Sequence, residues 1–238
     1  MSFLERTFSY DAPYVKIFSL SHLCFFIFAI FTILFFLKKK DFIKKNRETI
    51  RKIFIGLLIF QPILLYSWFF FCTEVFLSDG LPLHLCRIAG FIALYYLVSK
   101  KEWAINILGN FSLFATLTFF YPSAVYHFAH ITTPSYMINH LSIVLIPIFA
   151  AVAYDWYPSM KAFKQSAIAY LIYIGFIIII NPLTGGNYFY LNKRPFAFLN
   201  EIPLSIYLAV VIVITLLLFF VFTKYLLHLK ERKNAPNR

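Results

Sequence analysis

This sequence has few charged residues and shows no internal repeat. Only 13% of its 238 residues are Asp, Glu, Lys or Arg, while 61% are hydrophobic and 31 are phenylalanine. A soluble domain usually carries about twice that charged fraction and does not need so large an apolar content. The composition therefore excludes an ordinary soluble globular protein and indicates a membrane protein.

Paired cysteines are also missing. The three cysteines, Cys24, Cys72 and Cys86, are an odd number, and each lies in or beside an apolar run. Their spacing offers neither a disulfide framework nor a Cys-x-x-Cys metal pair. The chain does not open with the basic region, short apolar core and small-residue cleavage site of a signal peptide, so we expect its first apolar segment to remain in the mature protein.

What the sequence does contain is a series of long apolar blocks separated by short polar stretches. A transmembrane helix needs about 20 mainly apolar residues, and this chain has room for about seven. We therefore predict an all-α polytopic membrane protein that forms one domain, residues 1–238. Its helices are expected at about 17–37, 53–72, 82–98, 103–122, 137–153, 166–180 and 204–227, with the sixth stopping at Asn181-Pro182.

The net charge of +12 is distributed unevenly along the chain. With seven helices, one side of the membrane receives 17 of the 22 Lys and Arg residues and five of the ten Asp and Glu residues, which leaves the other side neutral. The positive-inside rule makes the basic side cytoplasmic. We therefore predict a multi-pass protein of the cell membrane, with its N-terminus outside and its C-terminus in the cytoplasm. We expect membrane lipids as partners and no nucleic acid, because the basic residues do not alternate with exposed aromatic ones.

Residues 81–90 place three reactive or ionisable side chains at the start of an apolar run. Proline fits the first turn of a helix, so we expect the third helix to open at Pro82 and to include His84, Cys86 and Arg87 in its first two turns. At about 100° per residue, His84 and Arg87 would share a face and Cys86 would point away from His84. A basic partner for Cys86 would then come from another helix.

The seven-helix arrangement brings further polar residues to the same outer level. Ionisable groups at membrane depth are costly unless they are paired or hydrated, which makes them candidates for function. The candidate binding residues are Glu74, His127, His130, and Asn181, Asn187 and Tyr188 in the turn-rich segment after the sixth helix.

The first functional interpretation is acyl transfer. Cys86 would be the nucleophile, a histidine from another helix would deprotonate it, and Arg87 or the N–H groups at the start of the third helix would stabilise the oxyanion. This mechanism needs no metal ion and no cofactor. In the simpler interpretation Cys86 is a small packing residue, and His84 is a hydrogen-bonded interfacial histidine.

Two other functional interpretations compete with acyl transfer. His127 and His130, three residues apart, could bind a metal ion together with another histidine or Glu74, as in a metal-dependent membrane hydrolase. A transporter or small-molecule binding protein would need a pathway across the bilayer, for which Pro62 and Pro147 could provide kinked helices. The gathering of ionisable residues at one surface favours a site that opens to the outer leaflet.

Several motifs in combination resemble a known family. They are the run Leu81-Pro82-Leu83-His84-Leu85-Cys86, the pair Asn139-His140, and the block Asn181-Pro182-Leu183-Thr184-Gly185-Gly186-Asn187-Tyr188 followed by Arg194-Pro195. In this order, which covers most of the chain from the second helix to the seventh, the sequence resembles the YwaF-like bacterial integral membrane proteins. These are similar in turn to the eukaryotic transmembrane protein 164 family.

The resemblance implies a seven-helix protein and, from the eukaryotic branch, cysteine-dependent phospholipid acyl transfer. Residue by residue, it implies that Cys86 of the His-Leu-Cys motif is the nucleophile and that His140 is its basic partner. We therefore predict a lipid-directed acyltransferase or acyl hydrolase, with Cys86, His140, His84 and Arg87 as the catalytic residues.

Overall fold

The computed structural model describes residues 2–234, and within this range the regular secondary structure is helical. Six helices are long and apolar enough to cross a membrane, and a seventh, α5, is shorter. This confirms the prediction of an all-α polytopic membrane protein with about seven helices. The seven are α2 (Leu20–Lys38), α4 (Arg47–Cys72), α5 (Leu85–Ser99), α6 (Glu102–Phe120), α7 (Thr133–Tyr154), α8 (Met160–Thr184) and α9 (Leu204–Asn234).

Shorter helical segments precede or connect these helices. Two of them are α-helical, one is a π-helical turn and two are 3-10 turns. They are α1 (Phe3–Phe8), α3 (Lys40–Lys45), η1 (Phe76–Gly80), η2 (Tyr188–Tyr190) and η3 (Ala197–Glu201).

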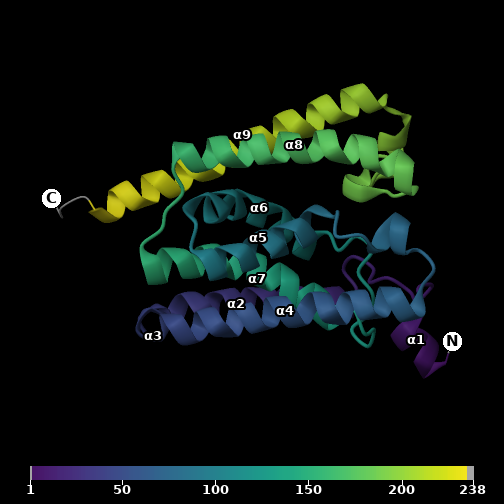
Figure 1. The fold of residues 1–238 in the computed structure, drawn as a ribbon, viewed down its shortest axis with the longest axis horizontal. Coiled ribbons are helices and arrows are strands. Elements are labelled where there is room, and N and C mark those ends of the chain that lie inside the picture. Colours follow the sequence, from purple (N-terminus) through teal and green to yellow (C-terminus); the bar gives the residue numbers. More distant parts are fainter. Residues whose placement is uncertain (1, 235–238) are drawn as a thin grey trace.

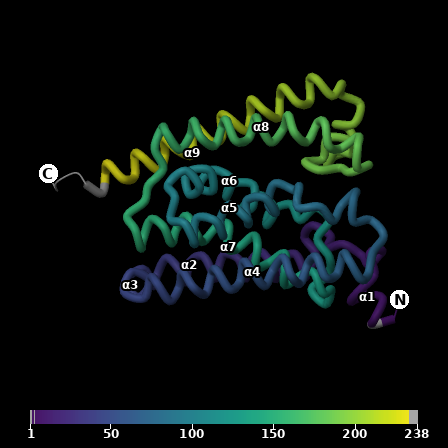
Figure 2. Tube along the Cα trace, viewed as in Figure 1, coloured from purple at the N-terminus to yellow at the C-terminus, as the bar shows by residue number. Residues whose placement is uncertain are grey.

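The helices form three layers (Figures 1 and 2). Helices α8 and α9 lie side by side in one outer layer, α2 and α4 form the opposite one, and α5, α6 and α7 lie between them. Helix α6 packs against α5, α7 and α8. More than half of the apolar stretch of α6 is buried, whereas α2 and α9 expose most of theirs, which is expected of helices that face lipid.

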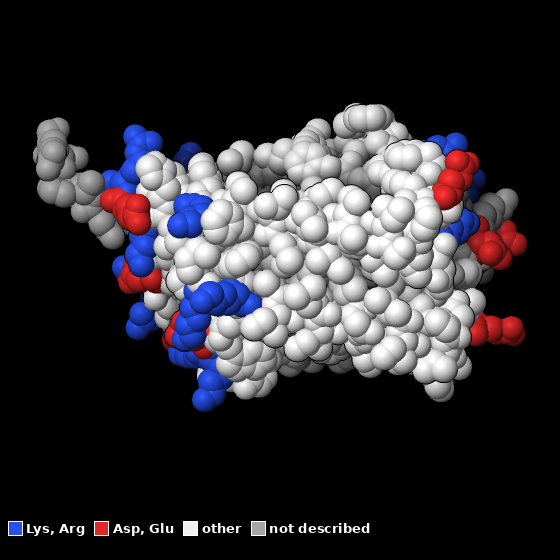
Figure 3. Space-filling view, turned by 90° about the horizontal axis from the view of Figure 1, so that it is seen from above, with Lys and Arg blue, Asp and Glu red and all other residues white. Residues whose placement is uncertain are grey.

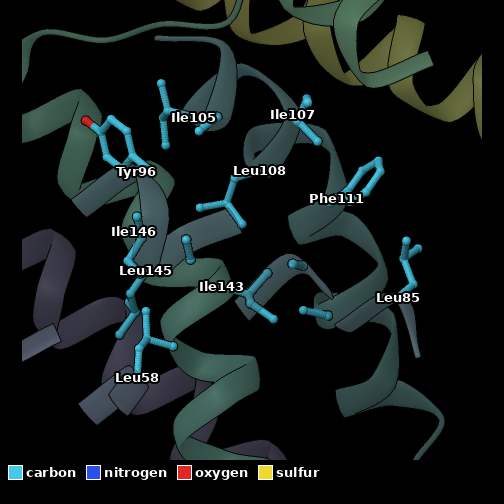
Figure 4. Packing of buried hydrophobic residues seen from close by; sticks show 14 of the residues in the cluster. Leu58, Leu85, Tyr96, Ile105, Ile107, Leu108, Phe111, Ile143, Leu145 and Ile146 are labelled. Carbon is cyan, nitrogen blue, oxygen red and sulfur yellow. The ribbon is translucent and has the colours of Figure 1, made fainter. Parts of the chain in front are cut away.

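The centre of the molecule is a continuous apolar core between α4, α5, α6 and α7 (Figure 4). Leu108 on α6 and Ile143 and Ile146 on α7 have no exposed surface. Branched aliphatic side chains pack closely in this layer. The three central helices therefore hold the residues at the ends of the bundle in fixed positions.

The third membrane helix starts later than the sequence predicts. It begins at Leu85, and His84 is its N-cap residue, with extended backbone angles of φ −64° and ψ 136°. Pro82 lies in a separate turn that is closed by a hydrogen bond from the Leu83 N–H to the Leu81 carbonyl. The prediction that His84 belongs to the first helical turn is therefore wrong, and the helical-wheel argument does not place its side chain.

The sixth membrane helix does not stop at Asn181-Pro182. Helix α8 continues through Pro182 to Thr184, and Gly185, with φ +66°, terminates it. A proline in the last turn removes only one intrahelical hydrogen bond, whereas glycine adopts a left-handed conformation without steric cost. The helix end is thus set by Gly185 and not by the proline.

The charged residues lie at the two ends of the bundle, with an uncharged band between them (Figure 3). Lys and Arg crowd one end, where α3 and the end of α9 lie. This unequal distribution agrees with the prediction that most Lys and Arg residues lie on one side of the membrane. The orientation of the ends relative to the membrane stays a prediction.

Candidate functional site

A cavity of about 450 Å³ lies toward the end of the bundle opposite the basic one. Its wall combines side chains from α4, η1, α5, α6, α7, η2 and α9 with residues of the N-terminal segment and of the α6–α7 connection. The volume falls within the roughly 300–1,000 Å³ that is usual for small-molecule sites. Segments from most of the chain thus enclose one space large enough for part of a lipid.

Polar side chains gather on part of this wall. They come from η1, from the start of α5 and from α7, and they are Asp79, His84, Cys86, Arg87, Asn139 and His140. Four of these six residues, Cys86, His140, His84 and Arg87, are those for which the sequence predicts catalytic roles. The structure therefore brings the four side chains to a single cavity, although His140 is far from the others in sequence.

Cys86 is the second residue of α5, and its partly buried thiol is free. The N–H groups of Arg87 and Ile88 donate to the His84 carbonyl at 2.8 and 3.1 Å, so the first turn is anchored on His84. Cys86 thus presents a free thiol to the cavity from the first turn of α5.

His140 on α7 is held by the residue one turn before it. In the neutral ring, Nδ1–H donates to the Tyr136 carbonyl at 2.8 Å, which leaves Nε2 unprotonated. The rings of Tyr136 and Phe119 pack against the imidazole, with centroid separations of 4.2 and 6.2 Å. A fixed imidazole with a basic Nε2, in the same cavity as a thiol, is suited to act as a general base.

Asn139 connects the helices that carry these two side chains. Its Nδ2 donates a hydrogen bond to the Cys86 carbonyl at 3.0 Å. Its buried Oδ1 has no hydrogen-bond partner within residues 2–234 and lies against Gly90, where an added Cβ would be 2.3 Å away. The absence of a side chain at Gly90 thus allows α5 and α7 to approach closely beside Cys86.

His84 is paired with a carboxylate that precedes it in the chain. Its Nε2–H donates to Asp79 Oδ1 at 2.9 Å, and its ring makes an edge contact with Tyr188. Burial by itself would raise the pKa of Asp79, but the hydrogen bond from His84 and the charges of His84 and Arg87 lower it below its ordinary value. Asp79 is therefore a carboxylate at neutral pH, and it orients the His84 ring at the cavity wall.

Arg87 braces the turn between η1 and α5. Its Nη1 donates to the carbonyls of Asp79 and Leu81, and its guanidinium lies 5.1 Å from the centroid of the Phe69 ring. These contacts hold the segment that carries Asp79 and His84, whereas the catalytic role predicted for Arg87 stays a prediction.

Comparison with protein families identifies the family of this chain. The model of the TMEM164 family matches residues 17–223, which include Cys86, Asn139 and His140. The chain belongs to the TMEM164 family. The match confirms the resemblance to a TMEM164-like membrane protein that the motifs indicate. No curated protein and no solved structure gives a significant match.

Three of the predicted binding residues of this TMEM164-family protein lie outside the cavity wall. Glu74 and His127 are exposed, whereas His130 is 1% exposed. The His130 Nε2–H donates to the Ser9 carbonyl at 3.2 Å, and its ring stacks on Tyr126 at 3.9 Å. His130 thus fastens the N-terminal segment to the α6–α7 connection, and ligand binding by these three residues stays a prediction.

The other predicted binding residues shape the loop after α8. Asn181 Oδ1 accepts from the Tyr188 N–H at 2.9 Å, and its Nδ2 donates to the Tyr188 carbonyl at 3.0 Å. Asn187 Oδ1 accepts two backbone N–H groups from further along the loop. This framework places Phe189 and Tyr190 in the cavity wall. Asn181, Asn187 and Tyr188 are not wall residues themselves.

Some residues of the site were missed by sequence analysis. Asp79 is one of the five acidic residues on the side predicted to be neutral, and its position five residues before His84 is the one sequence signal of their pairing. Gln61 is a polar residue within a membrane helix, which is itself a signal of function or of pairing, and its Nε2 donates to Ser135 Oγ at 2.8 Å. Tyr190 lines the cavity with a left-handed backbone, φ 55°, which no sequence signal predicts.

The structure also shows where the residues predicted for a metal site lie. Within residues 2–234, no three His, Cys, Asp or Glu side chains form a group that could hold a metal ion. His127 and His130, the pair predicted for such a site, differ in environment because the first is exposed and the second is buried.

Proposed function

We propose that this member of the TMEM164 family transfers or hydrolyses acyl groups of membrane lipids through a thioester on Cys86. One observation carries the proposal. Cys86, at the start of α5, and His140, whose Nδ1 is bonded to a backbone carbonyl, line the same cavity. A thiol at a helix N-terminus and an oriented imidazole are the two groups that cysteine-based acyl transfer requires.

In the first half-reaction, His140 Nε2 takes the proton of the Cys86 thiol while the sulfur attacks the carbonyl carbon of a lipid ester. The ester C–O bond breaks, the acyl group becomes a thioester on Cys86, and the leaving alcohol takes the proton from His140. The Cys86 N–H, in the first turn of α5, is available to donate to the oxyanion that forms in between.

In the second half-reaction, the hydroxyl of an acceptor lipid, or water, gives its proton to His140 and attacks the thioester carbonyl. The C–S bond breaks, and the thiolate takes the proton back from His140. The products are a new ester in the transfer reaction or a free acid in hydrolysis. Both half-reactions balance with the protein's own groups and no added cofactor.

We further propose that the Asp79–His84 pair and Arg87 position the turn in front of Cys86, and that the site faces the outer leaflet of the cell membrane. The support for the positioning role is the set of contacts that ties this turn together: the His84 Nε2–H donates to Asp79, and Arg87 Nη1 donates to two carbonyls. The support for the outer leaflet is the crowding of Lys and Arg at the opposite end of the bundle.

Lipid turnover by cysteine variants tests the proposal. Purified protein in liposomes, or cells analysed by lipidomics, should lose turnover by at least about 100-fold in Cys86→Ala and in Cys86→Ser. Cys24→Ala and Cys72→Ala are matched controls, because both thiols are free and exposed, and these variants should keep it. A chelator should have no effect. Chelator-sensitive turnover that survives Cys86→Ala would overturn the cysteine mechanism in favour of a metal site.

A further inference from the structure

We propose that the acyl chain reaches Cys86 from within the bilayer, through a lateral window between the outer halves of α6 and α9. The inference rests on the proposed function for the nature of the occupant, one acyl chain of a membrane lipid. The route itself follows from how these two helices meet and separate.

Helices α6 and α9 are joined around their midpoints. Phe111 and Phe114 on α6 pack against Phe219 on α9, with ring centroids 6.0 and 5.9 Å apart. Deeper still, the Thr223 hydroxyl donates to Asn110 Oδ1 at 3.3 Å. These contacts form the lower edge of the window.

Further out, the same two helices line the cavity. Leu117 on α6 and Tyr207 and Val211 on α9 all belong to its wall. Above them, the Tyr121 hydroxyl donates to the Pro195 carbonyl at 3.2 Å and so joins the end of α6 to the loop before α9. The window thus has an upper edge as well as a lower one.

Leu117 is the wall residue from which we infer that the cavity meets the lateral surface. It lines the cavity and is also 51% exposed, within a helix long and apolar enough to cross the membrane. Phe120, one turn away on α6, is 58% exposed. An exposed apolar side chain at this depth faces lipid, so a chain in the outer half of the bilayer would meet the cavity at Leu117.

The wall between the window and the polar residues is suited to a hydrocarbon chain. Phe114, Phe189, Tyr207 and Val211 provide apolar surface along it. At about 450 Å³ the cavity has the size of a site for a drug-sized ligand, which is smaller than a whole two-chain phospholipid. It therefore fits a segment of one chain beside Cys86, while the rest of the lipid stays in the bilayer.

On the aqueous side, an N-terminal strap, residues 7–15, is attached to the α6–α7 connection and to α4. The Val15 N–H donates to the Val125 carbonyl at 2.7 Å, and the Trp68 Nε1–H donates to the Phe8 carbonyl at 2.7 Å. On this side the exposed wall residues are Tyr14 and Ala124. An acyl chain that entered here would leave the bilayer and expose its CH₂ groups to water, which is unfavourable.

Photocrosslinking tests the route independently of catalysis. Cys86→Ala protein in lipid nanodiscs is mixed with a phosphatidylcholine that carries a diazirine in one acyl chain, irradiated and digested. Adducts are then measured on the peptide that contains Phe189 and Tyr190. Val211→Trp, which fills the window, should reduce these adducts by about tenfold, the change expected for a loss of roughly 1.4 kcal/mol in binding. Val210→Trp, on the adjacent and 50% exposed position, is the matched control and should not reduce them.

Leu117→Trp, on the opposite side of the window, is a second blocking variant that keeps the test decisive if Val211→Trp does not fold. Equal adduct yields in the folded blocking variants and in Val210→Trp would overturn the window. Loss of adducts in Ala124→Trp but not in the blocking variants would overturn it in favour of access from water. Because Cys86 is absent throughout, neither result depends on whether Cys86 is the nucleophile.

Discussion

The side-chain amide of Asn139 on α7 donates a hydrogen bond of 3.0 Å to the backbone carbonyl of Cys86 on α5. Because His140 follows Asn139 directly, this contact fixes the register between the proposed nucleophile and the proposed base. The amide oxygen lies against Gly90, one turn after Cys86. The close approach of α5 and α7 therefore depends on glycine at position 90.

Gly90→Ala should disrupt this contact. Its Cβ would lie 2.3 Å from Asn139 Oδ1, so Asn139 must turn away and release the Cys86 carbonyl, and overpacking of this kind costs about 1–3 kcal/mol. We expect a lower thermal unfolding midpoint in detergent and reduced lipid turnover. Gly56→Ala on α4 is the matched control, since nothing lies within 4 Å of its added Cβ. Equal stability of the two variants would contradict this account.

A second prediction concerns the base that acts on Cys86. An ordinary cysteine thiol has a pKa of about 8.5, so a thiol that reacts readily at neutral pH needs a basic partner. We expect His140→Ala to slow the labelling of Cys86 by iodoacetamide and to move the pH midpoint of labelling upward. His228→Ala, near the basic end of α9, should change neither.

His84 is the alternative base, since it also lines the cavity and is oriented by Asp79. The sequence predicts that His84 and Cys86 lie on opposite faces of one helix. His84 is the N-cap of α5 and has an extended backbone, so this reason for excluding it as the base no longer applies. An unchanged midpoint in His140→Ala, together with a shifted midpoint in His84→Ala, would transfer the role of base to His84.

The sequence predicts the number of membrane helices well but their ends less well. Apolar length indicates which residues lie in hydrocarbon, whereas a helix ends where its backbone hydrogen bonds end. Helix α4 thus begins at Arg47, ahead of the expected residue 53, because the basic residues before the apolar stretch continue the helix into the polar region. Helix α8 likewise continues beyond Asn181-Pro182 to Gly185.

The candidate site was predictable only where a motif marks it. Cys86, His84, Arg87 and His140 were found because reactive side chains in apolar runs are unusual and because their motifs resemble a family. Asn139 belongs to the Asn139-His140 motif, but its contact with the Cys86 carbonyl, like the position of Tyr190, depends on tertiary packing. The left-handed backbone of Tyr190 and the contact between Asn139 and Gly90 have no counterpart in local sequence pattern. Such contacts are fixed by the packing of whole helices.

A third prediction concerns pH and the N-terminal strap. The neutral His130 ring donates from Nε2 to the Ser9 carbonyl, and its Nδ1 accepts from Thr132, so neither nitrogen can take another proton without losing a bond. Burial lowers the pKa of His130 more than the bond to Ser9 raises it. A released histidine titrates at about 6.5, so below this pH His130 binds a proton when the strap is detached but not when the strap is docked.

Docking of the strap should therefore weaken as the pH falls from about 6.5 toward the lower pKa of docked His130, and it should be unaffected above about 6.5. Amide hydrogen exchange of residues 7–12, corrected for its intrinsic pH dependence, should show faster opening at about pH 5.5 than at about pH 7.5. His127→Ala should keep this difference, because His127 is exposed. His130→Phe should remove it, and a pH dependence that persists in His130→Phe would assign it to another group.

The last prediction is the orientation of the bundle, on which the outer location of the site depends. Reporter cysteines are placed in a background in which Cys24, Cys72 and Cys86 are replaced by alanine. Lys44 and Lys193 are suitable positions because both are exposed and they belong to opposite ends of the bundle, whereas Ile43 beside Lys44 is only 2% exposed. A membrane-impermeant maleimide should label Lys193→Cys in intact cells and Lys44→Cys only after permeabilisation, because the basic end is retained in the cytoplasm. The opposite labelling pattern would invert the bundle and place the cavity, with Cys86 and His140, at the inner leaflet.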